Sequence, residues 1–294
     1  MNLKCDVQYG KTDSEFRLTR VGVTGVKKPV MVRRKGEKNE LNKSLNCNID
    51  IFVDLPAEQK GSHMSRNVEV LTDVVSESLN EPVSGLENMA ADMCRKLLDH
   101  HEYSQTANVS ISADYFRPRK TPNGRDTYEV YRLTAEAEAV RGKGVRKTIG
   151  AEAIGMTACP CAQQTVTEIL GCSGETTVIS HNQRNVCSAS ITMDEDFEVE
   201  ADVLIDIIEE SFSSPTFELL KREDEGRVVI NAHTNPKFVE DVVRGVLSRI
   251  VDNFTELPDN SAVVVRSESE ESIHKHNAFA QREATLGELR KEAE

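Results

Sequence analysis

The order of hydrophobic periods along the first half of the chain is the feature that most restricts its fold. From Leu45 to Val53 every second residue is apolar, which is typical of a β-strand with one buried face. In residues 65–79 and 84–101 the apolar positions instead recur every three or four residues, which predicts two amphipathic helices. A further strand pattern precedes them at residues 21–34. These elements must bury their apolar faces against one another, so we expect a mixed α+β fold.

Two more strand patterns follow the helices, at residues 107–117 and 127–140. The segment between them, KTPNGRD, contains Asn123-Gly124, a dipeptide that favours a tight β-hairpin. The expected order of elements up to residue 140 is therefore ββααββ.

A similar order of elements begins again after Gly142–Gly144. Two strand patterns, two helix patterns and a further strand pattern cover most of the second half: residues 147–156, 186–193, 200–212, 236–254 and 262–267. A closing hairpin is less clear, and residues 284–294 are polar and helix-prone. We therefore expect two tandem ββααββ-like modules, residues 1–143 and 144–294.

Charge and cysteine content restrict the partners and the compartment. The 294 residues carry a net charge of −13, which argues against nucleic-acid binding but allows a small anion held by a local basic cluster. No apolar stretch of about 18 residues occurs and no apolar signal core stands at the start, so no membrane span or secretory signal is expected. The seven cysteines are irregularly spaced, which is typical of free thiols in a reducing cytoplasm. Cys47 and Cys94 lie in apolar patterns and are expected in the core.

Two other cysteines stand in GMTACPCAQQ, where Cys159 and Cys161 flank Pro160. A zinc finger needs a second cysteine pair at a defined spacing, and that pair is missing. Spacing alone leaves two interpretations open: a turn with one buried thiol, or an open metal site. The open site would combine one thiolate, the downstream imidazole of His181, one carboxylate and a free position for water.

Several carboxylates could complete such a site. The segment FELLKREDEGRVV offers Glu218, Glu223, Asp224 and Glu225. The alternative interpretation of this segment is a solvated, charged turn before a strand.

The segment NPKFVEDVVRGV is expected to open a helix at Pro236, a residue favoured at the first helical position. Glu240 and Asp241 then lie in the first turns, where carboxylates stabilise the helix dipole. Glu240 has a second possible role, because its carboxylate could hold a ligand that offers two N–H donors.

Two histidines in ESIHKHNAFA, His274 and His276, are two residues apart, so on a strand they would point to the same face. Such a pair is a candidate catalytic group, whereas a lone histidine is usually structural.

Cationic groups that could hold an anion stand at several places. Arg184 and Lys221 are the better candidates because they flank the candidate metal ligands in the sequence, whereas most other basic residues are expected to be solvated. In KGSHMSRN, Ser65 and Arg66 come just before a helix pattern, where backbone N–H groups and an arginine could hold phosphate.

Taken together, these motifs resemble those of one family, the GTP cyclohydrolases of the type IB/type IV group. The resembling segments occur in order along nearly the whole chain: DVQ, RVGVTGVKKPV, GSHMSRNVEVL, GMTACPCAQ, SHNQR, SSPTFELLKREDE, NPKFVEDVVR and ESIHKHNAFA. The form TACPCAQ is more similar to the archaeal, type IV (MptA-like) branch than to the bacterial IB branch.

The resemblance implies a tunnelling fold (T-fold) with two modules per subunit, assembled into an oligomeric barrel. The assembly would be a homo-oligomer, expected to be a tetramer, with active sites at subunit interfaces. Cys159, His181 and Glu225 would be the metal ligands. Fe(II) is the expected native metal, and Zn or Mn could occupy the same site, because thiolate, imidazole and carboxylate ligands suit each of them.

The resemblance also implies the roles of the other candidates. Glu240 would bind the guanine edge of GTP through a bidentate, charge-assisted pair of hydrogen bonds. The residues grouped as catalytic are His274 and His276, one of which would lie at the metal or transfer protons, and Cys161, a neighbour of the metal rather than a ligand. The residues expected to hold the triphosphate are Arg184, Lys221, Ser65 and Arg66.

The implied reaction is hydrolysis of the guanine imidazole ring with release of formate. In the type IV branch the product would be 7,8-dihydroneopterin 2′,3′-cyclic phosphate for tetrahydromethanopterin biosynthesis. Two alternatives stay open: a bacterial-type IB enzyme that forms 7,8-dihydroneopterin triphosphate for folate synthesis, and a non-catalytic pterin- or purine-binding protein on the same fold.

Overall fold

The computed structural model describes residues 7–10, 12, 14–34, 41–171 and 178–293. Cys5 and Cys172 lie outside the described residues. The chain divides into two compact units, each assembled from separate stretches of the sequence. Unit 1 comprises Met1–Asp114, Thr134–Ile149 and Thr192–Glu198, and unit 2 comprises Tyr115–Leu133, Gly150–Ile191 and Val199–Glu294. These units are defined by contacts and not by repeated elements. The expected module boundary at residues 143/144 therefore stays a prediction.

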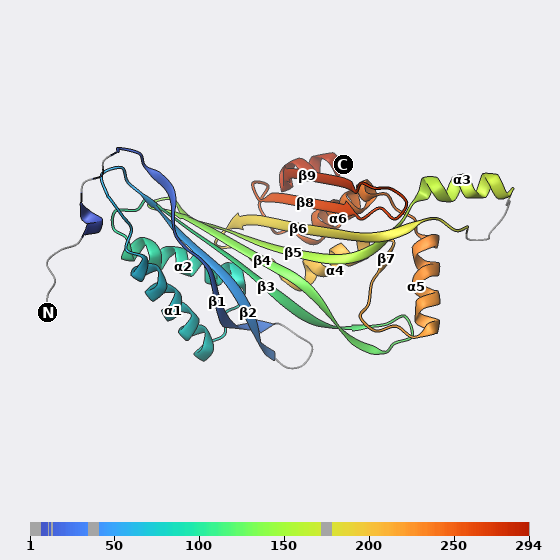
Figure 1. The fold of residues 1–294 in the computed structure, drawn as a ribbon, viewed down its shortest axis with the longest axis horizontal. Coiled ribbons are helices and arrows are strands. Elements are labelled where there is room, and N and C mark those ends of the chain that lie inside the picture. The colour runs from blue at the N-terminus through green and yellow to red at the C-terminus, as the bar shows by residue number, and fades with distance from the viewer. Residues whose placement is uncertain (1–6, 11, 13, 35–40, 172–177, 294) are drawn as a thin grey trace. The chain divides into compact units, whose positions relative to one another are not determined.

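Unit 1 begins with an antiparallel pair of strands, β1 (Leu18–Arg34) and β2 (Leu41–Leu55), which follow a 3-10 turn, η1 (Val7–Tyr9) (Figure 1). Every second residue from Cys47 to Val53 is fully buried. The alternating pattern of this segment therefore produces the predicted strand with one buried face.

Two helices, α1 (Met64–Asn80) and α2 (Leu86–His100), lie side by side in unit 1 (Figure 1). Each buries one apolar stripe, as the helical periodicity predicts. The next strand, β3 (Thr106–Lys120), pairs antiparallel with β2.

Tight turns join the following strands. Gly124 in the predicted hairpin has a φ of +78°, a conformation that glycine adopts without strain, and it leads into β4 (Asp126–Val140). Gly142 and Gly144, also at positive φ, turn the chain from β4 into β5 (Gly144–Ala158). The element order ββααββ up to residue 140 is confirmed.

Except for the last residues of β6, which belong to unit 1, unit 2 contains the helices and strands that follow β5 in the chain. They are α3 (Pro160–Leu170), β6 (Asn182–Asp194), α4 (Ala201–Ser211), β7 (Ser214–Pro215), α5 (Arg222–Thr234), α6 (Val239–Asn253), β8 (Ala262–Ser269), β9 (Ala278–Thr285) and α7 (Leu286–Ala293). The strands pair in the order β1-β2-β3-β4-β5-β6-β8-β9, with β7 paired to β5. The sequence patterns did not predict α3, α5 or β9.

The core of unit 2 explains a glycine in the cysteine motif. Helices α4 and α6 pack against each other through buried Ile and Val side chains. The chain leaves α4 at Phe212, whose buried ring lies directly over Gly155 of β5. A Cβ at Gly155 would lie 2.1 Å from the Phe212 ring, so no larger residue fits there without a shift.

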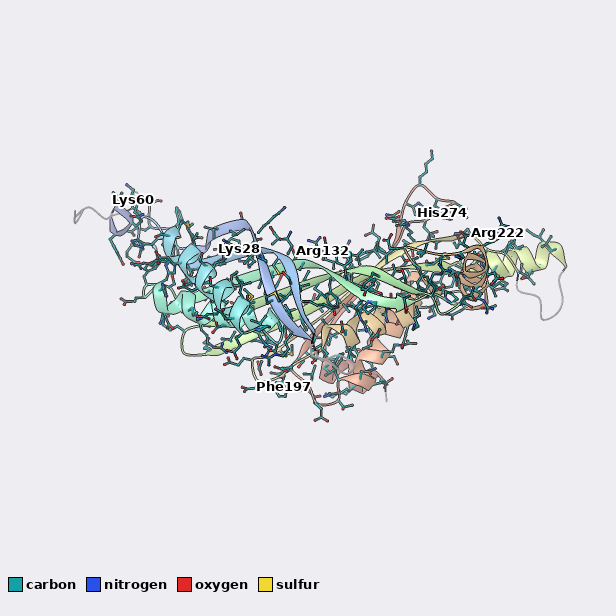
Figure 2. The ribbon with its side chains drawn as sticks, turned by 90° about the horizontal axis from the view of Figure 1, so that it is seen from below. Lys28, Lys60, Arg132, Phe197, Arg222 and His274 are labelled. Carbon is teal, nitrogen blue, oxygen red and sulfur yellow. The ribbon has the colours of Figure 1, made fainter. Side chains whose placement is uncertain are left out.

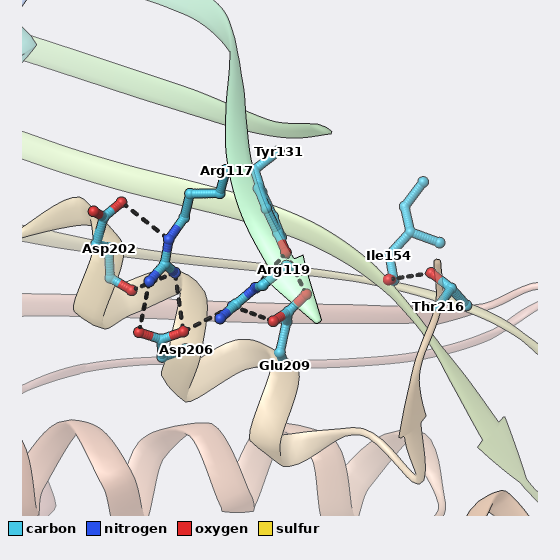
Figure 3. A network of polar contacts seen from close by, with 8 residues as sticks. All are labelled: Arg117, Arg119, Tyr131, Ile154, Asp202, Asp206, Glu209 and Thr216. Atoms are coloured by element: carbon cyan, nitrogen blue, oxygen red, sulfur yellow. Dashed lines mark hydrogen bonds and ion pairs between the residues drawn. The ribbon is translucent and has the colours of Figure 1, made fainter. Parts of the chain in front are cut away.

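An ion-pair network joins β3 to α4 within unit 2 (Figure 3). Arg117 donates two bonds to the carboxylate of Asp206, at 2.9 Å and 3.0 Å, and Arg119 pairs with Asp206 and Glu209. Burial raises the pKa of Tyr131, and the nearby charge of Glu209 raises it further. The Tyr131 hydroxyl donates a hydrogen bond to the Glu209 carboxylate. These two arginines are therefore occupied inside the fold and are not free to bind an anionic ligand.

Three described cysteines, Cys47, Cys94 and Cys187, are buried, and burial raises the pKa of each thiol to about 12. The expected core position of Cys47 and Cys94 is thus confirmed, and their reactive thiolate form is disfavoured. Among the described residues, no helix is long and apolar enough to cross a membrane.

Candidate active site

Cys159 stands at the start of α3 and caps it. Its backbone is extended, Pro160 follows at the first helical position, and the Cys159 Sγ accepts a hydrogen bond from the Ala162 N–H at 3.4 Å. Proline suits this position because the first helical N–H needs no partner within the helix. The CPC motif is therefore a helix start, with Cys159 half-buried and Cys161 exposed.

The segment before β6 lies against Cys159. The Cys159 N–H donates to the His181 carbonyl oxygen at 3.1 Å, and the Ser180 hydroxyl donates to the Cys159 carbonyl oxygen at 2.6 Å. The His181 side chain is only 11% exposed. Two residues separated by a helix and a loop in the sequence are thus neighbours in the fold.

A buried histidine on α5 braces this segment. His233 Nε2 lies 3.0 Å from the Ser180 carbonyl oxygen, and Gln163 of α3 donates to the carbonyl oxygens of Val178 and His233, at 2.8 Å and 2.7 Å. The two helices therefore hold the residues that lead into His181 from both sides.

The polar surroundings of His181 come from β6 and from the loop after β8. Its Nδ1 lies 3.0 Å from Gln183 Oε1 and 3.7 Å from Glu271 Oε2. Gln183 Nε2 in turn donates to Thr157 Oγ1 and Glu271 Oε1, each at 3.3 Å. The other ring nitrogen, Nε2, has no hydrogen bond within the described part of the chain.

A pocket of about 190 Å³ opens beside Cys159 in unit 2. The starts of α3, α6 and β9 contribute to its wall, together with β6 and the loop that precedes β9. The lining residues are Cys159, Gln183, Lys237, Phe238, Val239, Glu240, Glu271, Ala278 and Phe279.

Glu240 and Asp241 have different roles at the start of α6. The helix begins at Val239 rather than at Pro236, since the backbone of Phe238 is extended, and the Lys237 N–H donates to the Ala158 carbonyl oxygen. Asp241 accepts the Phe238 N–H at 3.0 Å and so caps the helix. Glu240 takes no part in this capping, and within the described residues its carboxylate has no hydrogen bond or ion pair.

Lys237 places a cation on the same pocket wall. Its Nζ donates to the Ser211 carbonyl oxygen at 3.0 Å. Burial, followed by the nearby charge of Arg249, lowers the pKa of this ammonium group. The start of α6 and the segment just before it thus contribute a cation, Lys237, and a carboxylate, Glu240, to the pocket.

His274 and His276 lie in the loop between β8 and β9, not on a strand (Figure 2 labels His274). Their rings nevertheless stack, with centroids 5.1 Å apart and an angle of 12° between the planes. His274 also meets His181 edge-on, at a centroid distance of 6.4 Å. The two histidines therefore do not lie on a strand, and His274 is the one that contacts His181.

Glu225 and Lys221 lie at the start of α5, so the interpretation of this segment as a turn before a strand is wrong. Glu225 is exposed and is not a lining residue of the pocket beside Cys159. Lys221 lines a wider hollow of about 1040 Å³ with Arg125 and Arg222, under which Asp224 is buried and accepts the Asn123 N–H at 2.9 Å.

The remaining candidates lie elsewhere. Arg184 is exposed on β6, one position after Gln183. Ser65 is exposed and Arg66 is half-buried in the first turn of α1 in unit 1, where Arg66 donates to the His100 carbonyl oxygen at 3.0 Å. Within the described ranges, no three His, Cys, Asp or Glu side chains gather closely enough to hold a metal ion.

The comparisons with known proteins decide the family. A family model described as Type I GTP cyclohydrolase folE2 matches residues 5–280. The chain belongs to the type I GTP cyclohydrolase folE2 family. This confirms the family expected from the motifs.

Relatives of this GTP cyclohydrolase family member align over almost their whole length. GTP cyclohydrolase MptA 1 of Methanocella arvoryzae is 44% identical, over 98% of this chain and 95% of the relative. GTP cyclohydrolase MptA of Methanothermobacter thermautotrophicus is also 44% identical, over 100% and 98%. The protein of the same name from Methanosarcina mazei is 43% identical, over 98% and 96%.

Solved structures support the fold. The uricase of Arthrobacter globiformis superposes with a TM-score of 0.54 at 8% identity, over 91% of this chain and 93% of that one. Urate oxidase from Bacillus sp. TB-90 gives a TM-score of 0.50 at 10% identity, over 91% and 100%. At this level of identity the likeness concerns the fold alone, and it confirms an α+β, tunnelling-fold-like architecture with an antiparallel sheet.

Among the polar and aromatic residues that line the pocket of this family member, the sequence did not indicate Gln183, Lys237, Glu271 and Phe279. Each stands within or beside a motif that had been noted, in SHNQR, NPKFVED and ESIHKHNAFA. Other residues of these motifs could be selected from the sequence because Cys, His and paired carboxylates suggest metal chemistry. An amide or a single lysine does not.

Proposed function

We propose that this chain is a metal-dependent GTP cyclohydrolase that hydrolyses the guanine imidazole ring of GTP with release of formate. The proposed product is 7,8-dihydroneopterin 2′,3′-cyclic phosphate, for tetrahydromethanopterin biosynthesis. The family and the relatives named MptA support this reaction. The observation that carries the proposal is that Glu240, a carboxylate left free by the capping role of Asp241, lines the same small pocket as Cys159.

Glu240 would recognise the guanine edge. Guanine presents a ring N–H and an amino group side by side, and an ionised carboxylate can accept both in a bidentate pair. Phe238 and Phe279 supply apolar surface for the flat ring, and the anchored ammonium group of Lys237 offers a donor for a carbonyl or ring nitrogen. The pocket thus combines recognition groups of the kind that a purine requires.

Cys159 and His181 fit a metal site in the chemistry of their donors. The thiol is half-buried at a helix start, and the imidazole keeps Nε2 available while Nδ1 is hydrogen-bonded. We propose Glu225 as the third ligand and Fe(II) as the native metal, with Zn or Mn able to replace it. Because Glu225 lies apart from the pair here, it would reach the site by movement of α5 or from a second copy of the chain. When bound, the metal would supply Lewis-acid activation of water.

Proton transfer would fall to the histidine pair. His274 meets the ring of His181 edge-on and stacks on His276, so it is the nearer of the two to the proposed reaction centre. An imidazole can both take and give a proton, as opening of the purine imidazole ring requires. Cys161, exposed on α3, would assist as a neighbour of Cys159.

The triphosphate would be held by the candidate cationic and hydroxyl side chains. Lys221 shares its hollow with the cations of Arg125 and Arg222, which alternate there with the carboxylates of Asp126, Glu223 and Asp224. Arg184, Ser65 and Arg66 complete the proposed phosphate-binding set.

A homo-oligomer, proposed as a tetrameric barrel of tandem modules, would cover apolar surface that is exposed in a single chain. Helix α3 buries none of its residues, and it extends beyond the ends of the strands of unit 2 (Figure 1). Ile169 is 76% exposed and Ile230 of α5 is 58% exposed. A second copy of the chain is the proposed partner of this surface.

Incubation with GTP and Fe(II) under anaerobic conditions tests the proposal. We expect formate and, after oxidation, a fluorescent pterin. The mass of the product separates the alternatives: a cyclic monophosphate supports the type IV reaction, and a triphosphate supports the bacterial-type IB reaction. GTP binding without formate in the fully metallated protein would instead favour a non-catalytic binding protein.

A further inference from the structure

We propose that Glu271 and Gln183 select the tautomer of His181 that carries its proton on Nδ1, so that Nε2 is the ring nitrogen able to bind a metal. The functional consequence rests on the proposed metal-dependent reaction. The tautomer itself depends only on contacts within unit 2.

The direction of the hydrogen bonds starts at Glu271. As a carboxylate it can only accept, and its Oε1 lies 3.3 Å from the terminal amide nitrogen of Gln183. The opposite orientation of the amide would place the Gln183 carbonyl oxygen against the carboxylate. Glu271 therefore orients the Gln183 amide with its NH₂ group toward itself.

A buried polar chain is compatible with this orientation, because the Thr157 hydroxyl can accept from the amide. Gln183 Nε2 also lies 3.3 Å from Thr157 Oγ1, which contacts Ser269 Oγ at 3.3 Å. Ser269 Oγ accepts from Asn185 at 2.7 Å, and Asn185 accepts from Ser267 at 2.7 Å. These four partners on β5, β6 and β8 are almost fully buried, so water does not compete for their hydrogen bonds.

The oriented amide determines the proton position on His181. With its NH₂ group toward Glu271, Gln183 presents its oxygen to His181 Nδ1 at 3.0 Å, and an oxygen acceptor requires a proton on that nitrogen. Glu271 Oε2, 3.7 Å from the same Nδ1, favours that proton electrostatically. In the neutral ring Nε2 then keeps its lone pair. Gln183 and Glu271 are therefore positioning residues that act through His181.

Nuclear magnetic resonance of the metal-free protein, labelled with ¹⁵N in histidine, tests the proposal directly. Long-range ¹H–¹⁵N correlations at alkaline pH identify which His181 nitrogen carries the proton. We expect Nδ1–H in the native protein and in Gln183→Glu, which keeps an oxygen acceptor. Gln183→Leu should show a substantial population of the other tautomer, and Glu271→Gln should do so to a smaller extent. Glu270→Gln, at the exposed neighbour of Glu271, is the matched control and should match the native protein.

Metal titration of the same variants gives a second readout. We expect Gln183→Leu to weaken Zn(II) or Fe(II) binding by about 10- to 100-fold, and Gln183→Glu to retain more of the affinity. An Nε2–H tautomer in the native protein, or an unchanged tautomer in both folded Gln183→Leu and Glu271→Gln, overturns the proposal. Failure of the native protein to bind metal at all would overturn the proposed function and leave the tautomer result to stand by itself.

Discussion

The backbone N–H of Cys159 donates to the carbonyl oxygen of His181 at 3.1 Å, and this bond joins two candidate ligands that lie far apart in the sequence. It brings the start of α3 against the start of β6. The side chains of both residues therefore depend on the position of the short segment that leads into His181.

His233 on α5 holds this segment through its contact with the Ser180 carbonyl oxygen at 3.0 Å. His233→Ala should weaken metal binding by about 10-fold, because residues around metal ligands typically contribute at least this much to affinity. His233→Gln, which can still donate a hydrogen bond, should recover part of the loss. Asn231→Ala, on the exposed side of the same helix, is the control, and equal affinities in all of these variants would show that the brace has no role in the site.

Removal of the charge should lower activity at Glu240 and stability at Asp241. Glu240→Gln should lower kcat/KM for GTP by about 100-fold, since it removes a charged acceptor from the proposed guanine contact. Its free energy of unfolding should change little, because the carboxylate makes no contact within the described residues. Asp241→Asn should retain activity and lose about 0.3–1 kcal/mol of stability, because the amide oxygen can still accept the Phe238 N–H but the negative charge at the start of α6 is removed. Steady-state kinetics and urea unfolding measure both quantities, and full activity in Glu240→Gln would exclude the proposed recognition.

Gly155 should tolerate no side chain. A Cβ there would lie 2.1 Å from the Phe212 ring, so Gly155→Ala should destabilise the protein by about 1–3 kcal/mol through overpacking. Gly226, in α5, has open space around the same position and provides the matched control. Gly226→Ala should stabilise the helix by about 0.5–1 kcal/mol. Urea unfolding that gives both variants the same stability would contradict the packing described for Phe212.

His101 in unit 1 should make stability depend on pH. Burial, with the nearby charges of Arg66 and two histidines, lowers its pKa from 6.5 to about 4. Its ring bonds to Asn67 Oδ1 at 2.6 Å and to the Tyr103 hydroxyl at 2.8 Å. One nitrogen therefore donates and the other accepts, which suits the neutral form.

Because the unfolded chain binds this proton more readily than the folded chain, the contribution of His101 is complete above pH 6.5 and is lost as the pH falls toward 4. Urea unfolding at a series of pH values should show this loss in the native protein and in His100→Gln. The loss should be smaller in His101→Gln. The same pH dependence in both variants would show that His101 is not its cause.

The sequence predicted most strands because their burial alternates regularly, as in the residues from Cys47 to Val53. It did not predict α3, because this helix is short and its few apolar side chains, such as Val166 and Ile169, are not buried in the single chain. Helix α5 was not predicted for a related reason. Its start is rich in charged residues, and one of them, Asp224, is buried where it accepts the Asn123 N–H from the turn between β3 and β4. In both helices, contacts from elsewhere in unit 2 decide the structure.

The sequence predicted the residue types of the site better than their arrangement in space. The sequence indicated Cys159, His181 and Glu240, and the fold places Cys159 and Glu240 on one pocket, with His181 beside Cys159. Gln183 and Glu271 could not be selected, because an amide becomes informative only when its partners in space are known. Glu225 stays a proposal, since the described arrangement leaves it exposed on α5.

Formate release from GTP by the iron-loaded protein, measured together with iron content in Cys159→Ser and Cys161→Ser, tests the central claim most directly. We predict that the native protein binds iron and releases formate in step with GTP consumption. Cys161→Ser should keep its iron, whereas Cys159→Ser should lose both iron and turnover. A fully loaded native protein that releases no formate, or a Cys159→Ser variant with native iron content and turnover, would contradict the account.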